Sequence, residues 1–310
     1  MLLRVSEVEH RATDVVSLGL RPTDREQLPD WSPGSHLELI FGPDFVRQYS
    51  LCGEIESSDV WRIAVRREAS GRGGSQWIHD RVRRGDVLKA RGPRNNFRLV
   101  PARRYLFIAG GIGITPILPM VREVATQEQP WTLLYGGRNR ASMPFVDELS
   151  QLAGGALHVV PEDDQGLLDL AAFLETPDSD TAIYCCGPEP LIDAVERRCD
   201  VWPPGALHRE RFSPRAEPTR PEDEFTVRLD RSCIQLSVPA ERSLLDVLEE
   251  AGFAVDNSCR AGICGTCLQT VLDGDPDHRD DVLTDEERDA GDVILPCVSR
   301  SRTAVLVLDL

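Results

Sequence analysis

The sequence predicts three successive folding units: an antiparallel β-barrel, an α/β unit with a parallel sheet, and a small α+β unit. Three observations support this order. Short strands separated by turn residues fill the first hundred positions, strands alternate with helices after Pro101, and a proline-rich segment precedes a last part that contains a cysteine loop. A chain of 310 residues is long enough for two or three domains, each with its own core.

The first unit is predicted from short segments rich in β-branched and aromatic residues, bounded by Gly, Pro, Asp or Ser. Even spacing of such segments is typical of a small antiparallel barrel. One helix is expected among them, over residues 75–83. The expected strands are residues 2–9, 15–20, 36–41, 49–52, 61–66 and 87–91.

A glycine loop precedes this helix and is a candidate phosphate site. Gly73 and Gly74, after Gly71 and Arg72, leave backbone N–H groups exposed at the helix N-terminus, where a phosphate is favoured. Ser75 is expected to add its hydroxyl as the N-cap. The alternative interpretation is an ordinary turn and cap.

A second ligand pattern stands at the start of a strand, in Arg47-Gln48-Tyr49-Ser50. Strand alternation places Arg47 and Tyr49 on one face, and Ser50 offers a hydroxyl group. The alternative is an exposed strand whose tyrosine only packs.

The second unit is predicted from alternating strands and helices, which indicate a parallel sheet. Its first loop, Gly-Gly-Ile-Gly-Ile-Thr-Pro at 110–116, follows a strand and opens a helix, where a pyrophosphate would bind, although it lacks the G-x-G-x-x-G pattern. A later turn, Cys186-Gly187-Pro188, would lie at the same carboxyl edge. Both also fit plain tight turns. The expected strands are 105–109, 131–135, 157–160 and 181–185. The expected helices are one that follows Pro116 and runs through Val124, and others near 144–152, 167–174 and 188–198.

The third unit follows a linker at 213–223, which its prolines would make semi-rigid. Two strands, 225–229 and 234–238, precede a helix that begins after Ser243, and 304–308 is a last strand. The expected domains are thus 1–102, 103–212 and 224–310.

Four cysteines in this unit have the spacing of a plant-type 2Fe-2S site. Cys259, Cys264 and Cys267 follow the pattern C-x4-C-x2-C, and Cys297 comes after 29 intervening residues. Gly262 would let the loop wrap closely and turn N–H groups toward the sulfurs. The alternatives are buried thiols, disulfides or zinc, but zinc usually shows paired C-x2-C knuckles and only one pair is present.

Composition excludes several classes of protein. The chain is 41% hydrophobic and 28% charged, as in ordinary globular proteins, and has no apolar run long enough to span a membrane. The N-terminus lacks a signal-peptide pattern and the other five cysteines show no framework spacing, so a cytoplasmic location is expected. The net charge of −16 argues against binding to nucleic acid.

The acidic residues are concentrated near the cysteine loop. Ten acidic and two basic residues lie between Asp273 and Asp292. This run is either a solvated loop and helix face or a docking surface for a basic redox partner.

Taken together, these motifs resemble the phthalate dioxygenase reductase family, which includes vanillate demethylase reductase-like proteins. This family is a branch of the ferredoxin-NADP reductase superfamily that carries a C-terminal plant-type ferredoxin domain. The resemblance covers essentially the whole chain and implies an FMN-binding β-barrel, an NAD(P)H-binding α/β domain and a β-grasp 2Fe-2S ferredoxin domain. Such a chain takes hydride from NADH onto FMN and passes single electrons through the cluster to a terminal Rieske-type oxygenase or demethylase.

The resemblance also assigns roles to individual residues. Ser50, Cys186 and Phe212 would lie at the reacting rings, with Phe212 in the Glu-x-Phe pattern of Glu210, Arg211 and Phe212. The cluster ligands would be Cys259, Cys264, Cys267 and Cys297. The cofactor-binding residues would be Arg47, Tyr49, Ser50, Gly73, Gly74, Ser75, Gly111, Thr115, Pro116, Arg138, Cys186, Gly187 and Pro188. Asn95 and Asn96 match a further signature for which the sequence suggests no physical role.

Nucleotide choice and partner stay open at this point. NADH is favoured, although Arg138 and Arg140 follow a strand end where guanidinium groups could meet a 2′-phosphate of NADPH. The electron acceptor could be a cytochrome P450 instead of a Rieske-type oxygenase. A redox sensor or binding module without turnover is the alternative of another class, and a monomer is expected.

Overall fold

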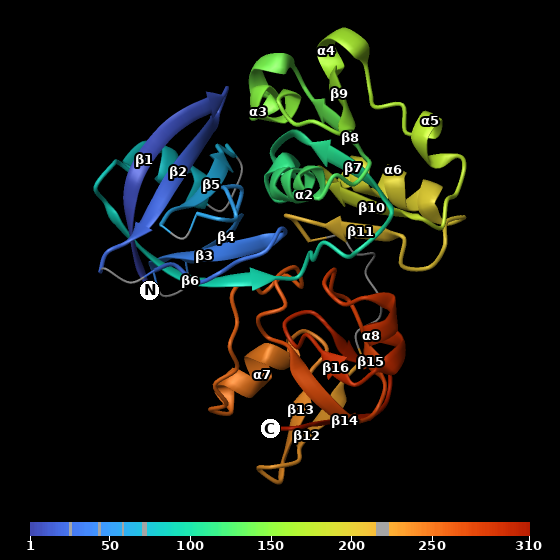
Figure 1. Ribbon diagram of the computed structural model, residues 1–310. Helices are drawn as coiled ribbons and strands as arrows, with labels where there is room; N and C mark the ends of the chain where they lie inside the picture. The colour runs from blue at the N-terminus through green and yellow to red at the C-terminus, as the bar shows by residue number, and fades with distance from the viewer. Residues whose placement is uncertain (25–26, 43–44, 58, 70–72, 215–222) are drawn as a thin grey trace. The chain divides into compact units, whose positions relative to one another are not determined.

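The computed structural model describes residues 1–24, 27–42, 45–57, 59–69, 73–214 and 223–310 (Figure 1). These residues form two compact units, Met1–Glu210 and Arg211–Leu310. Most of the linker expected at 213–223 lies outside the described residues, as do Gly71 and Arg72 of the first glycine loop.

An antiparallel sheet of six strands opens the first unit, in the order β4-β3-β6-β1-β2-β5. A bridge between Leu51 and Ile63 joins the chain after β4 to β5, and it closes the sheet into a barrel. Leucine, isoleucine and valine side chains fill the interior, with Trp61 fully buried among them. Five of the six predicted strands are confirmed, and the one expected at 49–52 lies earlier, at 45–50. The strands are β1 (Leu2–Ala12), β2 (Val15–Pro22), β3 (Ser35–Gly42), β4 (Phe45–Ser50), β5 (Trp61–Arg66) and β6 (Val87–Asn95).

The chain then passes from the barrel to a second sheet through residues held by two tyrosine hydroxyls. Tyr184 Oη accepts a hydrogen bond from Val100 N (2.7 Å) and donates one to the Arg98 carbonyl (3.0 Å). Tyr105 Oη donates to the Val100 carbonyl and accepts from Ala102 N. The crossing segment is therefore fixed to the sheet along its length.

The second sheet is entirely parallel, with the strand order β11-β10-β7-β8-β9. Successive side chains point to opposite faces and helices cover both, so the central strands β7, β8 and β10 are mostly apolar, whereas the edge strands β9 and β11 are less buried. Four strands confirm the prediction and β11 was not predicted. The strands are β7 (Arg104–Gly110), β8 (Trp131–Gly137), β9 (Gly155–Pro161), β10 (Thr181–Cys186) and β11 (Leu207–Glu210).

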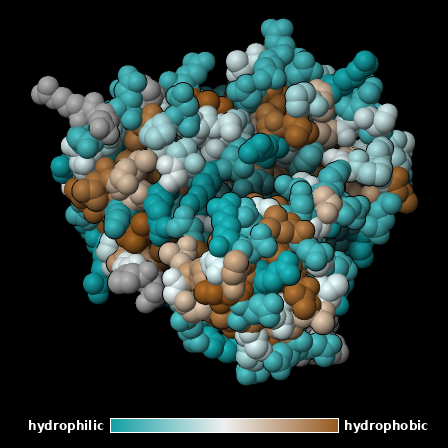
Figure 2. All heavy atoms as spheres, turned by 90° about the horizontal axis from the view of Figure 1, so that it is seen from below, coloured by the Kyte–Doolittle hydropathy of each residue, from teal (hydrophilic) through white to brown (hydrophobic). Residues whose placement is uncertain are grey.

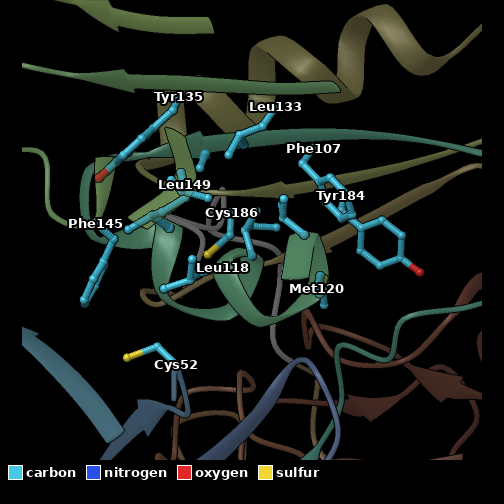
Figure 3. Packing of buried hydrophobic residues seen from close by; sticks show 14 of the residues in the cluster. Cys52, Phe107, Leu118, Met120, Leu133, Tyr135, Phe145, Leu149, Tyr184 and Cys186 are labelled. Atoms are coloured by element: carbon cyan, nitrogen blue, oxygen red, sulfur yellow. The ribbon is translucent and has the colours of Figure 1, made fainter. Parts of the chain in front are cut away.

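The helices of this part partly differ from the prediction. Two are shorter than expected, because residues 167–170 are not helical and the helix expected over 144–152 keeps little more than one turn. Figure 3 shows how side chains of α2 and α3 pack on one face of the sheet. The helices are α1 (Gly74–Arg81) in the barrel, then α2 (Ile114–Thr126), α3 (Val146–Ser150), α4 (Glu162–Gln165), α5 (Ala171–Leu174) and α6 (Glu189–Cys199).

The second unit is a mixed sheet with one packed helix, in the order β13-β12-β18-β14-β16. β12 pairs antiparallel with β13 and parallel with β18, and the helix α7 packs on this sheet. Ser243 caps α7 as predicted, accepting a hydrogen bond from Asp246 N. The elements are β12 (Phe225–Leu229), β13 (Ile234–Val238), α7 (Leu244–Glu250), β14 (Gln269–Asp273), β15 (Pro276–Asp277), α8 (Asp285–Ala290), β16 (Val293–Ile294), β17 (Arg300–Ser301) and β18 (Val305–Leu308).

One face of the molecule is mainly polar. Figure 2 shows one face, on which hydrophilic side chains predominate and hydrophobic ones gather in small groups. In the described part of the chain, no helix is both long enough and apolar enough to cross a bilayer.

Candidate functional site

The two ligand patterns of the barrel come together in space. Arg47 and Tyr49 lie on the same face of β4, and the first residue of α1, Gly74, packs against both. A Cβ atom at Gly74 would lie 2.6 Å from Arg47 Cγ and 3.3 Å from Tyr49 Oη. Only glycine allows this approach, so the helix N-terminus and the arginine face the same space.

The N-terminus of α1 is suited to an anion. Its N-cap is Gly73, with φ 84°, and no side chain caps the helix. The expected cap by Ser75 was wrong: this residue lies one position inside the helix, and its Oγ accepts a hydrogen bond from Glu68 N (3.0 Å). Without a cap or an acidic residue in the first turn, the helix N-terminus keeps its positive end open beside Arg47.

Tyr49 and Ser50 are in different environments. Burial raises the pKa of Tyr49 far above its ordinary value although Arg47 opposes the shift, so the phenol stays neutral. Ser50 is buried at the end of β4, where it pairs with His36 of β3. This segment therefore presents a neutral aromatic group and a hydroxyl rather than a charge.

The signature asparagine Asn95 has a structural role that the sequence did not reveal. Its Nδ2 donates to Ser32 Oγ and to the Pro33 carbonyl, both at 2.8 Å, and its Oδ1 accepts from Phe97 N (2.9 Å). Gly34 has φ 90°, and a Cβ there would lie 1.9 Å from the Phe97 carbonyl oxygen. Asn95 thus fixes the loop that leads into β3.

The two glycine loops of the parallel sheet meet at its carboxyl edge, as predicted. A Cβ at Gly113 would lie 2.3 Å from the Cys186 carbonyl oxygen, and one at Gly187 would lie 2.9 Å from Gly110 N. β7 and β10 are adjacent in the sheet while the chain between them runs outward to β8 and β9. Crevices at such a reversal of strand order bind ligands in open α/β sheets.

The first loop continues as a 3-10 turn, η1 (Gly111–Gly113), into α2. Thr115 Oγ1 donates a hydrogen bond to the Ile112 carbonyl (2.9 Å), so the proton of the Thr115 hydroxyl is used within the loop. Pro116 lies in the first turn of α2, where its missing N–H costs nothing.

The structure adds an arginine that the sequence interpretation missed. Arg66, at the end of β5, places Nη1 3.5 Å from the position a Cβ would take on Gly111. Its Nε donates to Glu68 Oε1 (2.7 Å). Because the two residues are 45 positions apart, no local pattern could have indicated a cation at this loop.

Cys186 and Glu210 face each other across β10 and β11. The Cys186 side chain is fully buried and points into the packed cluster of Figure 3, and burial followed by the charge of Glu210 raises the pKa of its thiol well above the ordinary value. Burial likewise raises the pKa of Glu210 to about 8. At neutral pH both groups are therefore protonated, and Cys186 contributes its backbone rather than its sulfur to the crevice.

Two further predicted residues are more exposed. Arg138 follows β8 and makes no ion pair with any residue that the structure describes, whereas Arg140 pairs with Asp147 (3.0 Å). Phe212 belongs to the second unit and is 42% exposed, so its place beside the flavin stays a prediction.

The four cysteines of the second unit converge. All four are buried, with at most 8% of any residue exposed. The Cys259 thiol is within hydrogen-bonding reach of Cys264 and Cys297, and the Cys267 thiol is within reach of Cys297. These bonds lower the pKa of Cys259 and Cys267 and raise that of Cys264 and Cys297, and they link the four sulfurs into one buried group.

The cluster loop has the backbone that the sequence predicted. Gly262 and Gly265 have φ values of 68° and 67°, and a Cβ at Gly262 would lie 2.7 Å from Val298 Cγ2. Backbone N–H groups turn toward sulfur, from Ala261 to Cys259 (3.3 Å) and from Thr266 to Cys264 (3.5 Å).

Four adjacent buried sulfurs, two of which receive backbone N–H bonds, are suited to two bridged irons.

Two family models match parts of the chain. Residues 227–302 match the family described as 2Fe-2S iron-sulfur cluster binding domain. Residues 87–201 match the family described as dimethylamine monooxygenase subunit DmmA-like, N-terminal domain.

Three relatives cover the whole length or nearly so. The phthalate 4,5-dioxygenase oxygenase reductase subunit of Pseudomonas putida is 40% identical over 91% of this chain and 88% of its own. The solved structure of a phthalate dioxygenase reductase, described as a modular structure for electron transfer from pyridine nucleotides to [2Fe-2S], is 36% identical over 100% of this chain and 98% of its own, with a TM-score of 0.71.

The third relative is an intact type IV self-sufficient cytochrome P450 monooxygenase, 41% identical over 100% of this chain with a TM-score of 0.95. This chain spans only 41% of that longer protein. Two reductases thus match from end to end, and the P450 contains a similar segment. The chain belongs to the phthalate dioxygenase reductase family.

Proposed function

We propose that the chain is the reductase component of a multicomponent oxygenase. It takes a hydride from NADH onto FMN and passes single electrons through a 2Fe-2S cluster to a terminal Rieske-type oxygenase or demethylase. The observation that carries this proposal is the presence, in one chain, of a phosphate cradle beside Arg47 and Tyr49, a crevice of glycine loops and a group of four thiols.

The barrel residues fit FMN. The uncapped N-terminus of α1 and Arg47 would hold its phosphate, and Tyr49 would lie against its ring. Ser50 would donate its hydroxyl near the ring atom that accepts hydride. When bound, FMN supplies the conversion of a two-electron donor into a one-electron donor.

The crevice of the parallel sheet fits a pyridine nucleotide. Backbone N–H groups of the loop at Gly111 would meet the pyrophosphate, and the turn at Gly187 would flank the nicotinamide. The catalytic contribution of these loops is to hold donor and acceptor rings at contact distance, because hydride transfer needs no acid or base residue.

We further propose that the domains are 1–102, 103–212 and 224–310, joined by a linker at 213–223. The barrel interior and the outer face of the parallel sheet have hydrophobic clusters of their own, which supports the first boundary, although the cluster on the other face of the sheet also includes barrel residues such as Cys52. A cytoplasmic location and a monomeric state are parts of the same proposal.

A cytochrome P450 is the second candidate partner. The 41% identity with the self-sufficient P450 exceeds the 36% identity with the phthalate dioxygenase reductase structure, so the reductase half alone does not favour a Rieske partner. Reconstitution with each oxygenase class distinguishes them, because only a reduced P450 gives a carbon monoxide difference spectrum. A sensor or binding module without turnover would not reduce cytochrome c with NADH.

The test of the proposal is an anaerobic titration of the purified protein with NADH, followed in the visible range after the released flavin has been identified by chromatography. Bleaching of both flavin and iron-sulfur bands, with FMN in the extract, is expected. A flavin that bleaches without any cluster bands would contradict the assignment of the four cysteines and leave a simple flavin reductase.

A further inference from the structure

One carboxylate in the first unit is surrounded by three guanidinium groups. Arg62 forms a bidentate salt bridge with Glu148, with Nη2 donating to Oε2 at 2.8 Å and Nη1 donating to Oε1 at 3.2 Å. Arg122 Nη2 also contacts Oε2, and Arg11 Nη1 lies 3.5 Å from Oε1. We call these four residues the Glu148 hub.

The hub joins the barrel to the parallel sheet. Arg11 belongs to β1 and Arg62 to β5, whereas Arg122 belongs to α2 and Glu148 to α3. A backbone hydrogen bond from Thr13 N to the Ala141 carbonyl (2.8 Å) runs between the same two parts. Glu148 is thus the acceptor on which cations from both halves converge.

Phe145, at the start of α3, strengthens this junction. It is buried in the cluster that also contains Cys52 of the barrel, and both are labelled in Figure 3. The Arg62 guanidinium lies 4.9 Å and that of Arg11 5.9 Å from its ring centre. Its φ of 64° is costly for an aromatic residue, which indicates that the surroundings hold α3 firmly in place.

The hub also reaches the flavin motif. Arg62 donates to the Cys52 carbonyl from Nη2 (2.8 Å) and Nε (3.2 Å), and Arg122 Nη1 donates to the Gly53 carbonyl (3.2 Å). Cys52 follows Ser50 by two positions. The orientation of both arginines, and with it the path of the chain after Ser50, depends on the carboxylate between them.

Charge balance explains why one carboxylate matters. The side chains of Arg62 and Arg122 are only 19% and 14% exposed, so their repulsion is poorly screened. Glu54 also pairs with Arg122 (3.1 Å), but it is 70% exposed and touches no other arginine of the hub. Glu148 is therefore the group that holds the arginines together.

We propose that Glu148 is a positioning residue for hydride transfer, which sets the distance and overlap between a flavin held by the barrel and a nicotinamide held by the parallel sheet. The inference rests on the proposed function. A positioning role differs from a purely stabilising role because it changes the stacking of the two rings, which the charge-transfer absorbance of nicotinamide and flavin reports directly.

The test compares Glu148→Gln and Glu148→Ala with the control Glu54→Gln in the full-length protein with both cofactors. FMN content and the cluster spectrum are measured first. Stopped-flow mixing with NADH then gives the apparent Kd, the limiting rate of flavin reduction and the long-wavelength charge-transfer absorbance that stacked nicotinamide and flavin produce. The Glu148→Ala measurement is repeated in sodium formate and in sodium chloride of the same ionic strength, because a cavity of about 700 Å³ lined by Glu148, Arg62 and Arg122 admits a small carboxylate.

For both Glu148 variants, we expect full FMN content, weakened charge-transfer absorbance and a limiting rate lower by about 10- to 100-fold, the loss that a misplacement of about 1 Å can cause. Formate, but not chloride, should restore part of the rate in Glu148→Ala, and Glu54→Gln should behave as the wild type.

Wild-type absorbance and limiting rate in Glu148→Gln would overturn the proposal. So would a Glu148→Ala variant whose rate loss formate does not relieve while its FMN content is normal. If the wild-type protein itself is not reduced by NADH, the proposed function fails instead, and the two failures are distinct.

Discussion

Replacing Gly113 with alanine tests whether contact between the two glycine loops positions the nucleotide. Gly113 has φ −61° and ψ −8°, an ordinary helical conformation, so alanine adds no backbone strain. Its new Cβ would, however, lie 2.3 Å from the Cys186 carbonyl oxygen and 2.5 Å from the carbonyl carbon. Any effect of Gly113→Ala must therefore come from this contact.

The size of the effect follows from the distances. An ordinary Cβ contact begins at 3.4 Å, so the loop and the Cys186 turn must separate by about 1 Å. Forcing a methyl group into a packed site costs about 1–3 kcal/mol of stability. A misplacement of about 1 Å between reacting groups can lower a rate by about 100-fold.

The assay is stopped-flow reduction of the bound flavin by NADH, with FMN content and melting temperature measured on the same sample. We expect normal FMN content, because the barrel is untouched, together with a limiting rate about 100-fold lower. Gly42→Ala is the control, since among the described residues the atom nearest to its Cβ would be the Phe45 Cβ, at 3.8 Å. A Gly113→Ala protein with wild-type Kd and limiting rate would refute the reasoning.

Three further predictions follow from the sites. Cys267→Ser should abolish NADH-dependent cytochrome c reduction while sparing ferricyanide reduction, and equal loss of both would contradict the electron order. Arg138→Ala should raise KM for NADPH about tenfold and leave KM for NADH unchanged if this guanidinium meets a 2′-phosphate; a parallel change for both nucleotides would argue against that role. Because burial raises the pKa of Glu210 from 4.5 to about 8, its folded form keeps a proton that the unfolded chain loses. As the pH rises from 4.5 to about 8, the free energy of unfolding should therefore decrease by up to about 1.4 kcal/mol per pH unit. In Glu210→Gln the melting temperature should depend less on pH over this range.

The local patterns of the sequence were sufficient for much of the fold. The first three cysteines of the cluster motif, each glycine loop and the Arg-x-Tyr-Ser segment are patterns of a few residues, so spacing alone finds them, and their binding roles stay predictions. The two loops at Gly113 and Gly187 could also be placed together, because neighbouring parallel strands end at one edge of a sheet.

Features that depend on distant partners could not be predicted in this way. β11 is only four residues long, Leu-His-Arg-Glu, and exists because it pairs with β10 over its whole length. The Glu148 hub draws its members from positions 11 to 148, and Arg66 reaches a loop 45 residues away. Ser75 was misplaced because the left-handed glycine at 73, rather than a hydroxyl, begins α1.

Where the two loops touch, glycine backbone lines the crevice at the carboxyl edge, so few side chains there can be replaced. Alanine, the smallest change, already collides at Gly110, Gly113 and Gly187. A mutagenesis library aimed at a different coenzyme would therefore find few viable clones in these loops. We expect substitutions to be tolerated better beyond the end of β8, where Arg138 is exposed, so that a change of coenzyme would start there and leave the glycine loops unchanged.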